Sequence, residues 1–152
     1  MTVPVERLGK RERAATPPAF ARYLLDLVED RCGGPVAALW VARDTVYRGL
    51  VGDDLVWDRA RNARRYDGPF PIVAHPPCGP WGNYFYRSHE SRVDGVLSME
   101  FVHRYGGVVE QPIGSTLFAE YGQGGEVIKL KQSSYGHRSE KSTLLYLARS
   151  PW

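Results

Sequence analysis

The sequence predicts a single-domain α/β protein with a mostly parallel sheet and flanking helices. Its 152 residues, 43% of them hydrophobic and 24% charged, have the size and balance of one globular domain. Short apolar runs bounded by Gly and Pro predict strands, and longer segments with apolar residues at helical spacing predict helices. Residues 70–111 follow the order strand, loop, helix, strand, and a right-handed crossover would make those two strands parallel neighbours.

The first third of the chain predicts an N-terminal arm and one long helix. Residues 1–15 are polar and basic without an apolar period, so we expect a basic irregular arm before a domain that spans 16–152. Thr16, followed by two prolines, is expected to be the N-cap of a helix. Apolar side chains at helical spacing continue to the Cys32-Gly33-Gly34 segment, where the helix should end.

The rest of the chain alternates strands with turns and helices. A strand is expected over 35–41, and the turn-rich segment 44–58 is expected to form a hairpin. A strand over 70–74 leads into a proline-rich loop, after which Ser88 is expected to cap a helix from about 89 to 105. The remaining predicted elements are a short strand at 108–109, a short helix over 115–121 and strands over 127–132 and 142–148.

The segment Pro71-Ile-Val-Ala-His-Pro-Pro-Cys-Gly-Pro-Trp81 carries the clearest chemical signal. Pro76 and Pro77 end the strand and Gly79 permits a sharp turn, so Cys78 is presented by a rigid loop at the carboxyl edge of the sheet. Open α/β sheets bind their ligands at that edge, which makes Cys78 a candidate nucleophile. The alternative is a turn with a buried thiol, because most unpaired cysteines are small buried hydrophobes.

Glu110 is predicted to join Cys78, because both would follow neighbouring parallel strands. A carboxylate beside a nucleophilic thiol suits attack on a pyrimidine ring. The thiolate adds to C6, the glutamate holds N3 and the exocyclic group, and C5 can then take an electrophile. The groups that could favour the thiolate are His75, Arg87, Arg138 and the amino end of the following helix.

Aromatic and cationic side chains near this loop could hold a nucleic acid. Four aromatic residues follow the cysteine and could stack on a base, with core packing as the alternative for two of them: Trp81, Tyr84, Phe85 and Tyr86. Residues 58–65 form a predicted basic helical turn. Its arginines could contact phosphate or only face solvent: Arg59, Arg61, Arg64 and Arg65.

These motifs resemble those of cytosine C5 DNA methyltransferases. Pro-Pro-Cys after an apolar strand, with Val-Val-Glu-Gln-Pro following at 108–112, is similar to the Pro-Cys nucleophile loop and the Glu-Asn-Val strand end of that family. Gln132-Ser-Ser-Tyr-Gly136, followed by Lys141-Ser-Thr143, is similar to the Gln-x-x-Tyr-Gly…Lys-x-Thr pattern of minimal, phage-type methyltransferase-like proteins. The resemblance covers about residues 70–148.

The resemblance implies a reduced Rossmann-like, methyltransferase-like core with Cys78 as nucleophile and Glu110 as the acid that binds the base. It implies cytosine in DNA or a pyrimidine nucleotide as substrate and S-adenosylmethionine as cofactor. The further substrate contacts to consider are His75, Pro77, Trp81, Gln111, Gln132, Tyr135 and Arg138. Lys141 joins the four arginines as a candidate phosphate or DNA contact.

Departures from the family pattern leave three functions open. The family's glycine-rich cofactor loop is absent, because Val36–Val41 is followed by Ala-Arg-Asp. The chain could be a pyrimidine-modifying enzyme, or a catalytically inactive DNA- or partner-binding module derived from that family. It could also be another cysteine-nucleophile nucleotide enzyme that uses His75 or His137.

Composition limits the remaining possibilities. No Cys-x-x-Cys or His-x-Glu pattern is present, so no metal site is expected. No apolar run is long enough to span a membrane and the N-terminus has no apolar signal core, so we expect a cytoplasmic protein. A net charge of +3 permits a nucleic-acid or nucleotide partner. A protein partner or a homodimer remains compatible with the sequence.

Overall fold

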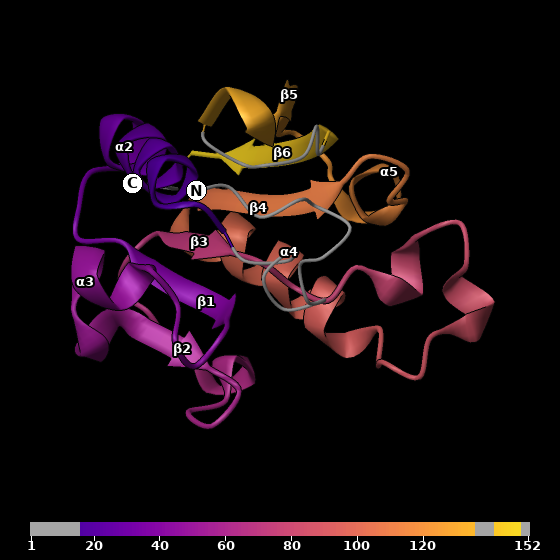
Figure 1. Cartoon of the computed structure of the whole chain (residues 1–152), viewed down its shortest axis with the longest axis horizontal. Coiled ribbons are helices and arrows are strands. Elements are labelled where there is room, and N and C mark those ends of the chain that lie inside the picture. Colours follow the sequence, from indigo (N-terminus) through magenta and orange to yellow (C-terminus); the bar gives the residue numbers. More distant parts are fainter. Residues whose placement is uncertain (1–15, 136–141, 150–152) are drawn as a thin grey trace, which may run out of the picture.

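A six-stranded sheet with the order β2-β1-β3-β4-β6-β5 runs through the computed structural model, which describes residues 16–135 and 142–149 (Figure 1). β2, β1, β3 and β4 are parallel, β6 is antiparallel to β4, and β5 is antiparallel to β6. Five of these six strands therefore share one direction, which confirms the predicted α/β class with a mostly parallel sheet. The strands are β1 (Ala37–Val41), β2 (Val56–Asp58), β3 (Ile72–Ala74), β4 (Gly107–Pro112), β5 (Glu126–Lys131) and β6 (Ser142–Ala148).

Helices cover both faces of this sheet (Figure 1). The α-helices are α2 (Pro18–Cys32), α3 (Tyr47–Val51), α4 (Val93–Tyr105) and α5 (Leu117–Tyr121). Short 3₁₀ helices lie at Asp53–Leu55, Ala63–Arg65, Gly79–Trp81, Phe85–Arg87 and Gln132–Tyr135. The expected N-terminal arm, residues 1–15, lies outside the described residues.

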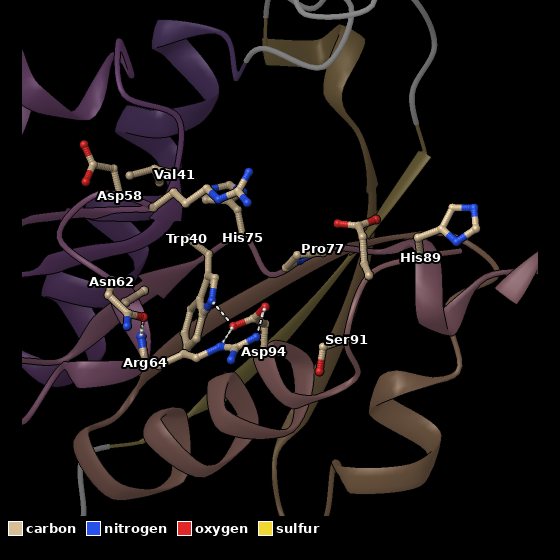
Figure 2. Close-up of a pocket in the computed structure, with 13 residues that line it drawn as sticks. Trp40, Val41, Asp58, Asn62, Arg64, His75, Pro77, His89, Ser91 and Asp94 are labelled. Carbon is tan, nitrogen blue, oxygen red and sulfur yellow. Dashed lines mark hydrogen bonds and ion pairs between the residues drawn. The ribbon is translucent and has the colours of Figure 1, made fainter. Parts of the chain in front are cut away.

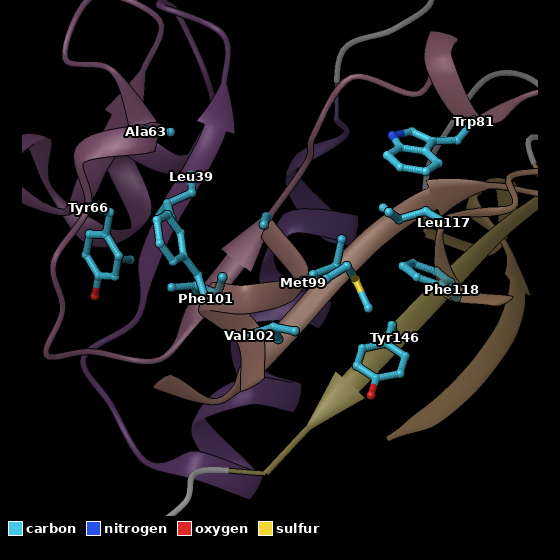
Figure 3. Close-up of a cluster of buried hydrophobic side chains, with 14 residues drawn as sticks. Leu39, Ala63, Tyr66, Trp81, Met99, Phe101, Val102, Leu117, Phe118 and Tyr146 are labelled. Carbon is cyan, nitrogen blue, oxygen red and sulfur yellow. The ribbon is translucent and has the colours of Figure 1, made fainter. Parts of the chain in front are cut away.

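Each face of the sheet has its own apolar core. Alternate residues of β1 and β3 point to opposite faces, so both strands are buried and their sequences are almost continuously apolar. One core packs Leu39 and Ile72 against Met99 and Phe101 of α4 (Figure 3). The other core packs the opposite face of the sheet against α2 and α3.

The predicted hairpin over 44–58 is wrong. The segment instead contains α3 and β2, and β2 pairs in parallel with β1 through the Ala38–Val56 register. A parallel neighbour needs a crossover rather than a tight turn. The fully buried Tyr47 anchors α3 to the sheet, and Gly52, at φ +86°, ends the helix so that the chain can enter β2.

Two predicted helix starts also differ from the structure. The N-cap of α2 is Pro17 rather than Thr16, and no side chain caps the helix. Pro18 occupies the first helical position, where its missing N–H costs nothing. Ser88 does not cap α4, which begins at Val93; its hydroxyl instead accepts a hydrogen bond from the Glu90 amide in the preceding turn.

The chain reverses direction across the sheet between β1 and β3. From β1 it runs outward to β2, then returns past β1 to build β3 and β4 on the other side. Such a reversal creates a crevice at the carboxyl ends of the strands, the usual place for a ligand in an open α/β sheet. The loop that carries Cys78 begins at this edge.

The first testable prediction concerns the contact between β3 and β4. Gly107 has φ +125°, and a Cβ built on it would lie 2.0 Å from the Ile72 carbonyl oxygen. Because the Ile72 backbone is held in the sheet and cannot move away from an added methyl group, Gly107→Ala should lower the free energy of unfolding by more than about 3 kcal/mol. Gly49→Ala, on an open and exposed position of α3, should have little effect in the same urea titration. Equal losses for the two variants would contradict this account of the β3–β4 pairing.

Candidate active site at the carboxyl edge of the sheet

The Glu110 carboxylate is the centre of a buried polar network. Val109 pairs with Ala74 in the parallel β3–β4 register, so Glu110 emerges beside the loop that follows β3. The residue is only 7% exposed. Thr143 and Gln132 donate hydrogen bonds to its Oε1 at 2.5 and 3.2 Å. These donors fix one carboxylate oxygen from β6 and from the turn after β5.

His75 contacts the other carboxylate oxygen. Its Nδ1 lies 3.4 Å from Glu110 Oε2, and its Nε2 lies 2.8 Å from the Tyr47 hydroxyl. Burial, with a smaller contribution from the Glu110 charge, raises the pKa of Tyr47 well above its ordinary value. The Tyr47 phenol therefore stays protonated. A neutral His75 that accepts this hydrogen bond at Nε2 carries its own proton on Nδ1, which faces the carboxylate.

The loop that carries Cys78 is tied to β4. Gln111 donates a hydrogen bond to the Pro76 carbonyl oxygen at 2.9 Å and accepts one from the Ser115 hydroxyl. Cys78 itself is exposed, so the alternative of a buried thiol is wrong at this position. Gly79 leaves room for the Ser88 side chain, because a Cβ built on it would lie 2.6 Å from the Ser88 hydroxyl oxygen. The chain thus presents an accessible thiol from a supported loop.

A cavity of about 700 Å³ opens at the carboxyl ends of β1, β2 and β3 (Figure 2). This is the crevice that the reversal of strand order creates. Its lining contains carboxylates, arginines and histidines beside one indole ring. The lining residues are Trp40, Val41, Asp58, Arg59, Asn62, Ala63, Arg64, His75, Pro77, His89, Glu90, Ser91 and Asp94.

Trp40 is held in the cavity wall by Asp94. Its φ of +56° is unusual for a bulky side chain, and such backbone strain is common at functional sites. The indole Nε1 donates to Asp94 Oδ1 at 2.9 Å, and Arg64 forms an ion pair with the same carboxylate at 2.8 Å (Figure 2). Burial favours the neutral acid, but the hydrogen bonds from Arg64 and Trp40 bring the pKa of Asp94 below its ordinary value.

Asp58, at the end of β2, is a second ionised carboxylate at the cavity. The backbone amide of Arg61 donates to it at 2.9 Å, and Arg48 forms an ion pair with it at 2.6 Å. The amide hydrogen bond and the Arg48 guanidinium lower the pKa of Asp58, although its burial opposes them. Both its oxygens therefore already have partners on the protein.

The structure brings four of the sequence-predicted residues together and separates others. Hydrogen bonds join Glu110 to His75 and Gln132, and Cys78 follows His75 by three residues in the loop after β3. Trp81 is 1% exposed and packs edge-on against a tyrosine of α5, which supports the alternative of core packing that the sequence left open. The other residues are placed as follows: Pro77, Arg59 and Arg64 line the cavity, Gln111 supports the loop, Tyr135 packs on Tyr23 of α2, Arg61 covers Trp57, and Arg65 is exposed.

Several residues of this edge were not singled out as site residues in the sequence, among them Trp40, Tyr47 and Thr143. Thr143 had a signal, because it is a polar residue at the start of an apolar strand and opposes the end of β4. Tyr47 and Trp40 had none, since their roles depend on the β2 crossover. Arg138, Lys141 and His137 lie outside the described residues, so their proposed contacts remain predictions.

Two further findings concern only the described ranges 16–135 and 142–149. No group of three or more His, Cys, Asp or Glu side chains there could hold a metal ion. No helix there is long and apolar enough to span a membrane.

Comparison with known proteins gives a distant structural likeness. No family model matches the chain, and no curated protein matches it. Among solved structures it is similar to a Listeria monocytogenes protein assigned as a class I S-adenosylmethionine-dependent methyltransferase, at 15% identity and a TM-score of 0.47. The alignment covers 96% of this chain and 64% of that protein. The fold therefore rests on the sheet topology described above, and the chemistry rests on the site.

The second prediction concerns the pH dependence of the Asp94 contacts. Because folding lowers the pKa of Asp94, its contribution to stability is present above the unfolded pKa of about 3.9 and is lost as the pH falls further. Asp94→Asn should therefore lower the free energy of unfolding by about 1–2 kcal/mol at pH 7. The difference in this free energy between the variant and the unmodified protein should narrow below about pH 4. Urea titrations from pH 7 to pH 3 measure this. Asp30→Asn, on the exposed side of α2, is the control. A loss of free energy of unfolding in Asp94→Asn that does not change with pH would contradict the prediction.

Proposed function

We propose that this protein modifies a pyrimidine base through a covalent adduct between Cys78 and C6 of the ring, with Glu110 holding the base. The observation that supports this most strongly is the parallel register of β3 and β4, in which Ala74 pairs with Val109. That register brings an exposed thiol and a buried, oriented carboxylate to one edge of the sheet. The preferred substrate is cytosine in DNA, followed by a pyrimidine nucleotide.

The reaction begins with the Cys78 thiolate. Its sulfur forms a bond to C6, the C5–C6 π bond breaks, and the electron pair moves to C5. As the adduct forms, N3 takes up one proton from solvent, and the Glu110 carboxylate accepts hydrogen bonds from that N3–H and from the exocyclic amine, which stabilises the electron-rich ring. Once C5 has taken its new group, solvent water removes the C5 proton, the electron pair restores the C5–C6 double bond, the sulfur leaves as thiolate, and N3 returns its proton to solvent.

Glu110 is prepared for this role by its neighbours. Thr143 and Gln132 occupy Oε1, and His75 orients Oε2. A carboxylate with these donors stays in one position, and a charged acceptor makes stronger hydrogen bonds than a neutral one. The same arrangement distinguishes Glu110 from an ordinary surface carboxylate.

The size and lining of the cavity at the ends of β1, β2 and β3 support S-adenosylmethionine as the cofactor. Its volume of about 700 Å³ lies in the range of small-molecule sites. The Trp40 ring could contact a purine, while Arg59 and Glu90 provide charges for the carboxylate and ammonium of an amino-acid moiety. When bound, this cofactor supplies an electrophilic methyl group for C5. The contacts would be made by side chains, because the glycine-rich loop of the family is absent.

The third prediction tests the nucleophile by intact-protein mass spectrometry. Incubation with DNA that contains 5-fluorocytosine, in the presence of S-adenosylmethionine, should trap a covalent adduct, because fluorine at C5 blocks the final elimination. Cys78→Ala should abolish the adduct, whereas Cys32→Ala, at the half-buried second cysteine, should leave it unchanged. No adduct with any 5-fluoropyrimidine DNA or nucleotide would contradict the proposed function.

The fourth prediction tests the carboxylate. Glu110→Gln keeps the shape of the side chain but removes its charge, so the rate of adduct formation should fall by about 100- to 10,000-fold, the usual scale of acid–base contributions. Glu100→Gln, on the exposed surface of α4, should react at the unmodified rate. Equal rates for the two variants would exclude a role of Glu110 in holding the base.

The same experiments separate the two alternatives. An inactive DNA-binding module would bind DNA in a salt-sensitive manner, would form no adduct, and would be indifferent to Cys78→Ala. Another cysteine enzyme would require Cys78 together with a histidine and would leave C5 of the pyrimidine unchanged. Isothermal titration with S-adenosylmethionine adds a direct test of the methyl donor.

A further inference from the structure

Three consecutive aromatic side chains are exposed close to the candidate nucleophile. Tyr84, Phe85 and Tyr86 are 65%, 57% and 65% exposed, whereas most other large aromatic side chains of the described ranges are buried or half-buried. With Arg87 they form the segment 84–87, called the aromatic segment below. A contiguous exposed apolar patch on a water-soluble domain commonly marks a binding site.

Two rings of the aromatic segment flank a cation. Tyr84 and Phe85 each contact Tyr86 edge-on, with ring centroids 6.4 and 5.8 Å apart. The Arg87 guanidinium carbon lies 5.3 Å from the centre of the Tyr84 ring and 5.6 Å from that of Tyr86. Flat apolar surfaces and a positive charge are therefore presented together.

The aromatic segment belongs to a loop that is closed next to Cys78. A Cβ on Gly79 would lie 2.6 Å from the Ser88 hydroxyl oxygen and 2.7 Å from Glu90 Oε1, so the two ends of the loop are in contact. Between these ends the chain extends away from the sheet, in the part of Figure 1 that joins β3 to α4. A strand of substrate bound along the rings would pass beside the thiol.

The positive charge of this loop favours a polyanionic partner, and its exposed rings favour a partner with flat aromatic faces. Residues 83–92 carry Arg87 and Arg92 against one acidic residue, Glu90. An apolar protein surface would cover the rings but would also bury the Arg87 guanidinium and the tyrosine hydroxyls, which is unfavourable without polar partners. Unpaired nucleotides match both features, since bases stack on aromatic rings and phosphates pair with arginine.

We propose that the aromatic segment is a stacking platform for the unpaired bases of single-stranded DNA, with Arg87 on the phosphate backbone. The proposal deepens the proposed function and rests on it for the identity of the reacting base. Under this proposal, the substrate is a cytosine in single-stranded DNA rather than a cytosine in a duplex or a free nucleotide. The faces of paired bases are covered by their neighbours in a duplex, so a duplex should bind more weakly.

Fluorescence anisotropy with the full chain and a labelled oligodeoxycytidine of about 20 nucleotides tests the platform. Tyr86→Ala should weaken binding by roughly five- to 150-fold, the effect of losing one stacked base. Val127→Ala removes a similarly exposed apolar side chain from β5 and should bind like the unmodified protein. A duplex of the same length should bind more weakly than the single strand.

The salt dependence tests Arg87 separately. Arg87→Ala should reduce the slope of log affinity against log salt concentration by about 0.7, the contribution of one phosphate contact on a single strand. Arg104→Ala, at another exposed arginine beside a tyrosine ring, should leave the slope unchanged. Circular dichroism melting curves should be the same for all of these variants, because each replaced side chain is exposed.

The proposal would be overturned by no detectable single-strand binding, by equal affinity for the duplex, or by equal affinities of Tyr86→Ala and Val127→Ala. A failure of the proposed function has a different signature. It would appear as the absence of a Cys78-dependent adduct with every fluoropyrimidine, while single-strand binding through Tyr86 persisted. A failure of the platform would instead leave adduct formation on single-stranded DNA unchanged in Tyr86→Ala.

Discussion

β3 and β4 can pair closely in their parallel register because Gly107 lets the first residue of β4 lie directly against the backbone of Ile72. No other residue has room at that position. The strand ends that carry Cys78 and Glu110 are adjacent only in this register, because a shift of one residue would turn Glu110 to the other face of the sheet. The candidate chemistry therefore depends on a backbone contact at the opposite end of the two strands.

Burying the Glu110 carboxylate carries a cost that the surrounding donors offset. A buried charge without partners destabilises a protein by several kcal/mol, so its position must be supported by hydrogen bonds. Here the support comes from three elements: His75 after β3, Gln132 after β5 and Thr143 on β6. Tyr47 extends the support by fixing the ring of His75. The antiparallel part of the sheet thus has a role at the site as well as in the core.

Local patterns in the sequence were sufficient for the centre of this fold. The apolar run before Pro76 and the helix ending at Gly106 predicted β3, α4 and β4, and with them the parallel pairing of the strands that carry Glu110 and lead to Cys78. β2 could not be predicted in this way, because three residues are too few for a period and its pairing depends on tertiary contacts of Tyr47. The cavity and the roles of Trp40 and Tyr47 follow from that crossover, so they were beyond the reach of local pattern.

Cys78 lies between a hydrogen-bonded segment on its N-terminal side and an exposed loop on its C-terminal side. On its N-terminal side, Pro76 is hydrogen-bonded to Gln111, which is fully buried in β4. On its C-terminal side, the loop is closed by the contact of Gly79 with Ser88 and then exposes its rings to solvent. A rigid support holds a reacting group at a fixed distance from its partners, while an exposed loop can adapt to a polymer. The position of the thiol between the two suits a residue that must meet a base delivered from outside the fold.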